Sequence, residues 1–389
     1  MKTIETTEEL AQFCSECSRY PYVTVDTEFL RERTYFSQLC LVQLARPGDD
    51  DREDAVLVDI LADGLSLEPL YDLFRNPDVV KVFHAARQDL EIFQVEAGVI
   101  PQPFFDTQVA AMVCGYGDQV GYETLVRRIA NQSIDKSSRF TDWSRRPLSA
   151  AQKKYAIGDV THLRVIYEDL AEQLKESGRS AWVEEELSIL LNPDTYTIDP
   201  EDAWQRVKTR TTSPRFLAAL KELAKFREAT ARDRNVPRNR IYKDDAMMEL
   251  AANRPKDLEE LGKSRLLLRE ARKGDIAEGI LKALRVAEIM PRDEIPKPEE
   301  RPRTANNATA LCDLLRVFLK ARSTQEGVAQ KLIASSADLD RLASEKKPDI
   351  AALKGWRFEV FGRDAMRLKR GEIALSANGS EINVVKIGG

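Results

Sequence analysis

Histidine is scarce in this chain, and cysteine is nearly as rare. The 389 residues include two histidines and five cysteines. So few histidines argue against histidine-rich zinc sites and against most catalytic triads, which depend on an imidazole base. Cys14 and Cys17 form one C-x2-C pair, but no second pair follows, and both fall in a predicted amphipathic helix. A zinc or redox role is therefore not expected for that pair.

Long apolar segments are also absent. The sequence contains neither a signal-like N-terminal segment nor an apolar run of about 18 residues, the shortest that reads as a membrane-spanning helix. Free thiols are typical of a reducing compartment, so the sequence predicts a cytoplasmic protein with no membrane partner. No protein partner is implied. Hydrophobic residues make up 43% of the chain, enough for each of two or three domains to bury a core.

Two carboxylates occupy a stretch that otherwise reads as a buried β-strand. Asp26 and Glu28 lie two residues apart within the largely β-branched and aromatic run 22–29. The period of two along a strand places both side chains on one face. Like charges held together at a strand end repel each other and resist ionisation unless a cation lies between them. The pair therefore predicts a divalent metal site.

Two further acids stand in contexts that would complete such a site. Asp89 follows the apolar run 79–84 and lies at a predicted junction between a strand and a helix. Asp159 lies in a predicted helix one turn after Tyr155, so the two side chains share a helix face. Four acids from separate segments offer the oxygen ligands that Mg²⁺ and Mn²⁺ prefer, and they suit two such ions.

The order of these motifs resembles that of the DEDD 3′→5′ exonucleases, in their tyrosine subgroup, and within it the ribonuclease D family. The resemblance rests on Asp26-Thr27-Glu28, on Asp89 within 84–90, on Tyr155-x3-Asp159, and on the supporting stretches 105–108 and 142–148. It implies a ribonuclease H-like fold, an α/β mixed sheet flanked by helices, over residues 1–200. Arg139 stands where the family commonly has glutamine, which leaves one substrate contact open. Asp106 is interpreted as a helix cap.

The resemblance also implies an activity. A metal-dependent 3′→5′ exoribonuclease would release nucleoside 5′-monophosphates from RNA 3′ ends, with tRNA precursors as the expected substrates. Asp26, Glu28 and Asp159 would hold one Mg²⁺ or Mn²⁺ ion. The second would be held by Asp26 and, through water, by Asp89, while Tyr155 would orient the attacking water. A DNA exonuclease of the same subgroup and a non-catalytic RNA-binding scaffold are the alternatives, although a scaffold would be expected to lack one of these acids.

The N-terminal 200 residues are predicted to alternate strands and helices. The run 34–45 is expected to pair antiparallel with the strand that carries Asp26. Helical segments are expected from about 121 to 190. Strands are predicted at 2–5, 21–28, 37–45, 55–60 and 79–84, and helices at 7–18, 67–75, 88–97 and 106–114.

The remainder of the chain is predicted to form two small all-α domains. Residues 205–290 and 305–389 resemble HRDC domains, which are small nucleic-acid-binding modules; for the second, a helical spacer is the alternative. Between them, 291–304 reads as a proline-rich linker. A short hairpin is expected around Asn378-Gly379 near the end of the chain.

Basic residues are concentrated in one segment although the net charge is −5. Residues 203–243 contain twelve Lys or Arg and three acids, a local charge of +9 that leaves −14 for the rest. Such segregation is typical of a phosphate-binding surface, with a solvated helix face as the alternative. Phe29 is the candidate wedge for the terminal base, and Tyr35 is a second candidate aromatic contact. The other candidate RNA contacts are Gln88, Trp143, Arg146, Lys208, Arg210, Arg215, Arg238 and Arg240.

Overall fold

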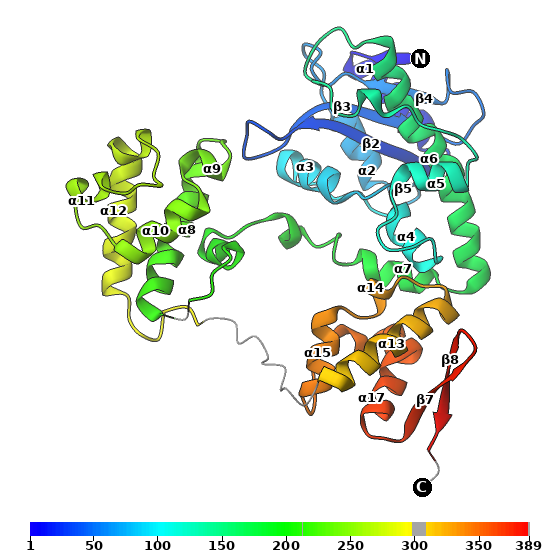
Figure 1. Cartoon of the computed structure of the whole chain (residues 1–389). Helices are drawn as coiled ribbons and strands as arrows, with labels where there is room; N and C mark the ends of the chain where they lie inside the picture. The colour runs from blue at the N-terminus through cyan, green and yellow to red at the C-terminus, as the bar shows by residue number, and fades with distance from the viewer. Residues whose placement is uncertain (212, 298–308, 388–389) are drawn as a thin grey trace.

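The computed structural model describes residues 1–211, 213–297 and 309–387. It consists of an N-terminal α/β domain and two helical domains, which we call the first (200–297) and the second (309–387) (Figure 1). Each helical domain has a hydrophobic core of its own. No helix within the described ranges is long and apolar enough to cross a lipid bilayer.

A mixed six-stranded sheet forms the centre of the N-terminal domain, in the order β1-β4-β3-β2-β5-β6. β2 is paired on both sides, antiparallel with β3 and parallel with β5. β1 and β4 are parallel, as are β5 and β6, whereas β3 and β4 are antiparallel. The strands are β1 (Lys2–Ile4), β2 (Tyr22–Leu30), β3 (Gln38–Ala45), β4 (Ala55–Val58), β5 (Val80–Phe83) and β6 (Phe104–Asp106).

Helices cover both faces of this sheet. On one face, α6 packs against β2, β3 and β4 and encloses a small core that includes Leu41, Ala156 and Val160. The larger core contains residues of α1, α2 and α3, among them Leu10, Phe74 and Phe93. The helices are α1 (Thr7–Cys17), α2 (Glu68–Arg75), α3 (Arg87–Ala97), α4 (Thr107–Val113), α5 (Tyr122–Arg128), α6 (Ala150–Ser177) and α7 (Ser180–Leu187), with 3-10 turns η1 (Lys136–Ser138) and η2 (Pro193–Tyr196).

The predicted mixed sheet flanked by helices is confirmed, including the antiparallel pairing of 34–45 with the strand of Asp26. One strand was missed. β6 pairs with β5 where the sequence suggested only the start of a helix. Asp106 ends that strand and caps α4, since its side chain accepts a hydrogen bond from the Gln108 amide, so the predicted cap is confirmed. Cys14 and Cys17 are free thiols buried in α1, as their helical pattern suggested.

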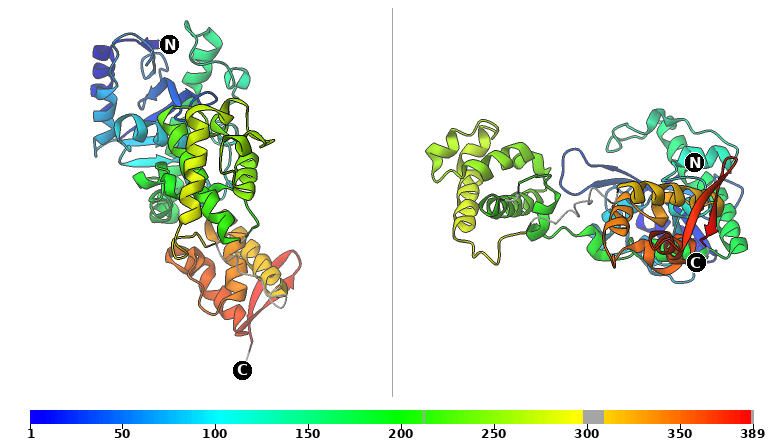
Figure 2. Two further views of the ribbon diagram at one scale, coloured as in Figure 1. Left: turned by 90° about the vertical axis from the view of Figure 1, so that its left-hand side faces the viewer. Right: turned by 60° about the horizontal axis from the view of Figure 1, so that its bottom comes forward.

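The first helical domain is built on the long helix α8, against which α9, α10, α12 and the 3-10 turn η3 pack. Figure 2 (right) shows it standing to one side of the molecule. Its elements are η3 (Pro200–Arg206), α8 (Pro214–Asp233), α9 (Arg238–Ile241), α10 (Asp244–Asn253), α11 (Leu258–Gly262), η4 (Glu270–Arg272) and α12 (Gly274–Ile289). Of the predicted linker 291–304, residues 298–304 lie outside the described ranges.

The second helical domain packs directly on the N-terminal domain. The Trp356 ring stacks on Trp182 with ring centroids 4.5 Å apart. Arg357 donates to Glu185 and forms a largely buried ion pair with Glu186. The predicted terminal hairpin is confirmed as β7 and β8. The elements of the second helical domain are α13 (Thr309–Glu326), α14 (Gln330–Ile333), α15 (Ser336–Ser344), η6 (Ala351–Leu353), α16 (Gly355–Arg357), η7 (Phe358–Gly362), α17 (Arg363–Lys369), β7 (Ile373–Asn378) and β8 (Glu381–Lys386).

Candidate active site

Three carboxylates converge at the end of the central strand. Asp26 and Glu28 project from β2, and Asp159 projects from α6, which crosses that strand. One carboxylate oxygen from each lies within 4.8 Å of the others, and within the described residues this is the only such acidic or histidine-containing group. The β2–β3 register shifts between Glu28 and Phe29, so the strand is irregular at this point. Irregular strand ends are common beside active sites because they redirect side chains.

Asp89 lies beside this cluster without belonging to it. It occupies the first turn of α3 and is buried. The hydroxyl of Thr27, between the two β2 acids, donates a hydrogen bond to Asp89 Oδ1. The structure therefore brings all four predicted acids to one place, three of them in a tight group and the fourth held by a threonine.

The site strongly disfavours four negative charges in the absence of a cation. Burial, and then the charge of Asp159, raise the pKa of Asp26 well above its ordinary value. Burial, and then the same neighbour, raise the pKa of Glu28 to about 9. Burial also raises the pKa values of Asp89 and Asp159 to about 7 each. Closely spaced oxygen donors that resist ionisation alone fit a divalent ion, because its charge offsets both the burial and the repulsion.

Tyr155 lies one helical turn before Asp159 and close to the acids. Burial, and then the charges of Asp159 and Glu28, raise the pKa of its phenol above the ordinary value near 10. A hydrogen bond from Tyr155 partly offsets the rise in the pKa of Asp159. The Tyr155 ring packs near Trp143, with centroids 6.2 Å apart. At neutral pH the hydroxyl is therefore protonated and can donate a hydrogen bond.

The acids line a pocket of about 660 Å³, a volume in the range of small-ligand sites and large enough for a nucleotide. Phe29 and Gln88, both predicted to contact RNA, line this pocket. Arg139 lines it too, and its charge lowers the pKa values of Glu28 and Asp159 against the effect of burial. Other lining residues are Thr27, His84, Gln108, Tyr122, Glu123, Lys136, Phe140 and Leu163.

Phe140 was missed by sequence reasoning. Its side chain is 90% exposed at the rim of the pocket, and the Arg139 guanidinium lies 5.2 Å from its ring centroid. The sequence did carry one indication of this role, because Phe140 follows the basic Arg139 in a segment without apolar periodicity. The sequence marked Arg139 only as a departure from the family pattern. In the structure it lines the same pocket as the acids.

Two predicted RNA contacts near the site are wrong. Trp143 is 2% exposed and lies in the core beneath α6, so neither ring face is available to a base. Arg146 forms two hydrogen bonds to the Asp59 carboxylate, at 2.5 and 2.6 Å, and donates to the carbonyls of Cys40 and Trp143. Both residues therefore support the loop before α6 and do not face substrate.

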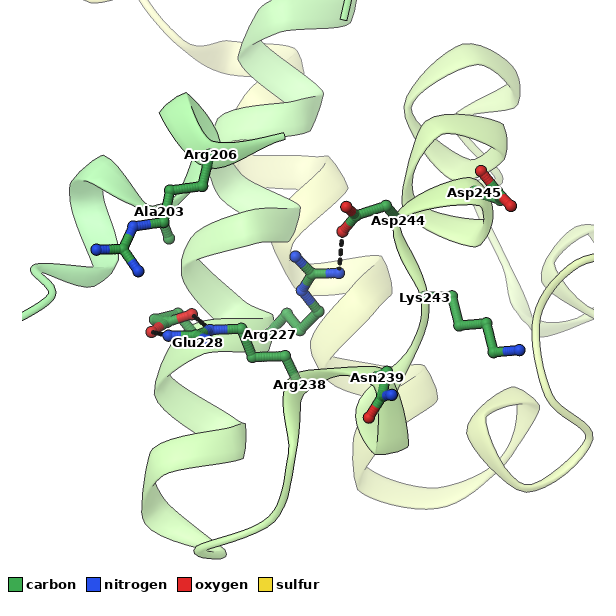
Figure 3. Close-up of a pocket in the computed structure, with 9 residues that line it drawn as sticks. All are labelled: Ala203, Arg206, Arg227, Glu228, Arg238, Asn239, Lys243, Asp244 and Asp245. Carbon is green, nitrogen blue, oxygen red and sulfur yellow. Dashed lines mark hydrogen bonds and ion pairs between the residues drawn. The ribbon is translucent and has the colours of Figure 1, made fainter. Parts of the chain in front are cut away.

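Ion pairs neutralise part of the positive charge of the basic segment 203–243. Among the residues that the structure describes, five of its twelve basic residues form ion pairs: Lys221, Lys225, Arg227, Arg234 and Arg238. Figure 3 shows two of these pairs, Arg227 with Asp244 and Arg238 with Glu228. Arg238 is thus tied to an internal carboxylate, contrary to its predicted role. Four predicted contacts, namely Lys208, Arg210, Arg215 and Arg240, are exposed and form no ion pair within the described residues.

Comparison with known families identifies two of the domains. Residues 1–175 match the model of the 3'-5' exonuclease family, and residues 216–284 match the HRDC domain. For the second helical domain the likeness to HRDC domains stays a prediction.

Several relatives cover almost the whole chain. Ribonuclease D of Jannaschia sp. is 62% identical over 385 residues, which span 99% of each chain. Ribonuclease D of Granulibacter bethesdensis is 48% identical over 99% of this chain and 96% of its own. The crystal structure of Escherichia coli RNase D, described as an exoribonuclease involved in structured RNA processing, aligns with a TM-score of 0.81 at 29% identity. That alignment covers 95% of this chain and 98% of the other.

Proposed function

Because the chain belongs to the ribonuclease D family and is a 3′→5′ exoribonuclease dependent on divalent metal ions, we propose that its four clustered acids are the catalytic centre. The observation that carries the proposal is the approach of Asp26, Glu28 and Asp159 to within 4.8 Å of one another. These three would hold one Mg²⁺ or Mn²⁺ ion. Asp26 and, through water, Asp89 would hold a second. When bound, such ions supply the Lewis acidity that activates a water molecule and stabilises the departing 3′-oxygen.

Tyr155 would orient the attacking water and would not deprotonate it. Its pKa is raised by burial and by neighbouring carboxylates, so the hydroxyl keeps its proton at neutral pH. A protonated phenol can donate or accept a hydrogen bond but is a poor general base. Trp143 lies beside its ring and would help to hold it in place.

The RNA 3′ end would enter the pocket beside Phe29, whose ring would separate the last base from the next. Arg139 would meet the phosphate, since it brings positive charge to a pocket otherwise dominated by acids. The exposed basic residues of the first helical domain would bind more distant phosphates, which would suit structured substrates such as tRNA precursors. The description of the E. coli relative as acting in structured RNA processing supports this substrate class.

The test is digestion of one structured RNA with an unpaired 3′ tail, labelled at either end, with Mg²⁺ or Mn²⁺. We expect 3′-labelled RNA to release labelled mononucleotide at once, and 5′-labelled RNA to shorten stepwise. Asp26→Asn should lower the rate at least about 10³-fold, because metal assistance supplies several kcal/mol of transition-state stabilisation. Asp63→Asn, at an exposed acid far from the cluster in sequence, is the matched control. Near-wild-type turnover by purified Asp26→Asn would refute the assignment.

A further inference from the structure

The loop between β2 and β3 reaches across to the first helical domain. The backbone amides of Tyr35 and Phe36 both donate to Asn235 Oδ1, each at 3.1 Å. The Tyr35 hydroxyl donates to Glu228, and the Arg238 guanidinium lies 4.9 Å from the Tyr35 ring centroid. Within the described ranges, apart from the cap of η3, where Asp199 accepts from the backbone amides of Glu201 and Asp202, every hydrogen bond between residues 1–199 and 200–297 is made by Tyr35 or Phe36. Figure 1 and the right-hand view of Figure 2 both show this loop approaching α8 and α9.

Glu228 makes this contact specific. Its side chain is 3% exposed, and a buried carboxylate is costly unless hydrogen-bond donors surround it. Arg238 supplies two of those donors, as Figure 3 shows, and Tyr35 supplies another from a different domain. The Tyr35 ring also packs against the core of the first helical domain. Burial, and then Glu228, raise the pKa of Tyr35 to about 12, so it stays a donor at physiological pH.

The backbone conformation of Asn235 suits it to accept these two hydrogen bonds. It follows the end of α8 with a φ of +48°, in the left-handed region that asparagine tolerates better than most residues. This conformation lets its side-chain oxygen accept from two consecutive amides of the loop. The contact therefore consists of backbone and side-chain groups of defined geometry, which is typical of a rigid interdomain contact. We call the contact of Tyr35 and Phe36 with Glu228 and Asn235 the joint.

The covalent connection at this boundary is short but would not fix an orientation by itself. η2 packs on α3 of the N-terminal domain, and η3 packs on α8 of the first helical domain. Only residues 197–199 separate η2 from η3. A single tether permits rotation, whereas a second contact at Tyr35 restricts it. The second contact lies on the loop that continues β2, the strand that carries Asp26, Glu28 and Phe29.

We propose that Tyr35 and Asn235 are positioning residues that hold the first helical domain in a fixed orientation toward the metal site. The expected consequence is substrate discrimination by length. RNA that spans both domains would be aligned with the catalytic pocket, while a short oligonucleotide that occupies only the pocket would not sense the joint. The inference rests on the proposed function, since it takes the exposed basic residues of the first helical domain to bind RNA.

The test compares full-length Asn235→Gly and the double variant Asn235→Gly/Tyr35→Phe with wild type. Glycine accepts the left-handed backbone, so Asn235→Gly removes the side chain without straining the backbone, and phenylalanine keeps the Tyr35 ring while removing the hydroxyl. Asn131→Gly is the matched control, because Asn131 is an exposed asparagine with a φ of +52° in the N-terminal domain, away from the joint. Thermal unfolding of each variant checks that the domains remain folded.

The first measurement needs no RNA. Spin labels at the exposed positions Glu176→Cys on α6 and Glu278→Cys on α12 report the distance distribution between the two domains. We expect a narrow distribution in wild type and Asn131→Gly, and a clearly broader one in the double variant. An unchanged distribution in the double variant would overturn the proposal.

The second measurement is kcat and KM on a five-nucleotide RNA and on a structured RNA with an unpaired 3′ tail. We expect the double variant to lose about 10-fold in kcat/KM on the structured RNA, mainly through KM, and to match wild type on the short one. Equal loss on both RNAs, or a broadened distribution without loss on the structured RNA, would also contradict the proposal. Failure of the proposed function itself would appear differently, as a wild-type enzyme with no greater affinity for the structured RNA.

Discussion

The Thr27 hydroxyl donates a hydrogen bond to the carboxylate of Asp89, which links the middle of the β2 motif to the first turn of α3. Both side chains are buried. Asp89 stands outside the tight group of three acids, and this hydrogen bond orients its carboxylate relative to β2. Hydrogen bonds to charged groups contribute about 1.5 to 3 kcal/mol, and partners that orient metal ligands commonly affect activity about 10-fold to 100-fold.

Thr27→Val should therefore lower kcat/KM by about 10-fold to 100-fold, with part of the loss recovered at high metal concentration. Valine has almost the same shape, so the fold should be retained, and Thr27→Ser should behave like wild type. Steady-state kinetics across a Mn²⁺ titration provide the check. If Thr27→Val and wild type respond identically to metal, Asp89 does not depend on this hydrogen bond.

Tyr155→Phe should lower kcat by about 10²-fold to 10⁴-fold while KM and metal affinity change little. The substitution removes one hydroxyl and leaves the ring against Trp143. Single-turnover rates and Mn²⁺ binding measured on the same preparation separate the two effects. Weakened metal binding with unchanged kcat would assign the hydroxyl to the metal site and not to the water.

Metal affinity should rise with pH from about 6 to about 9. In the metal-free protein the pKa values of Asp89 and Asp159 are raised to about 7 and that of Glu28 to about 9. These groups hold protons below their raised pKa values, so a metal ion must displace protons there and binds more weakly. Isothermal titration calorimetry with Mn²⁺ in buffers of different ionisation enthalpy should show proton release on binding. Affinity independent of pH over this window would contradict the prediction.

The second helical domain should be released when Arg357 is neutralised. Arg357→Met leaves Glu186 buried without its cation, and loss of one partner of a buried pair costs about 3 to 5 kcal/mol. The control is Arg363→Met, at an exposed pair with Glu359 in the same domain, which should cost under about 1 kcal/mol. Limited proteolysis, and urea unfolding followed by intrinsic tryptophan fluorescence, distinguish the two variants. Equal stability of the two variants would mean that the ion pair does not hold the domains together.

The clustered acids could be predicted from the sequence because each stands in a local pattern that indicates its surroundings. Asp26 and Glu28 lie in an apolar strand, and Asp159 and Tyr155 share a helix face, so periodicity placed each pair on one face, while the resemblance to the exonuclease family implied that the pairs meet. The hydrogen bond from Thr27 to Asp89 was not predictable. It depends on how β2 and α3 pack, and a threonine between two acids gives no signal of its own.

The errors arose where a residue's partner lies far away in sequence. Arg146 finds Asp59 through the tertiary fold, and nothing in the stretch 142–148 indicates that pairing. The charge of the 203–243 segment was overestimated because some of its partners, such as Glu201 and Asp275, lie outside the segment. β6 was missed since its three residues form a strand only by pairing with β5.

The stacking of Trp182 on Trp356 has a consequence for biosynthesis. The two rings lie 174 residues apart in the chain, so the docking face of α7 emerges from the ribosome well before its cover. At about 5 to 20 residues per second, the interval is about 10 to 35 seconds. For that time an indole and its apolar neighbours face solvent on an otherwise completed α/β domain. A nascent chain in this state exposes an apolar surface that chaperones can bind. A ribosome that stalls late in the message would leave the folded α/β domain with this apolar surface uncovered and prone to aggregation.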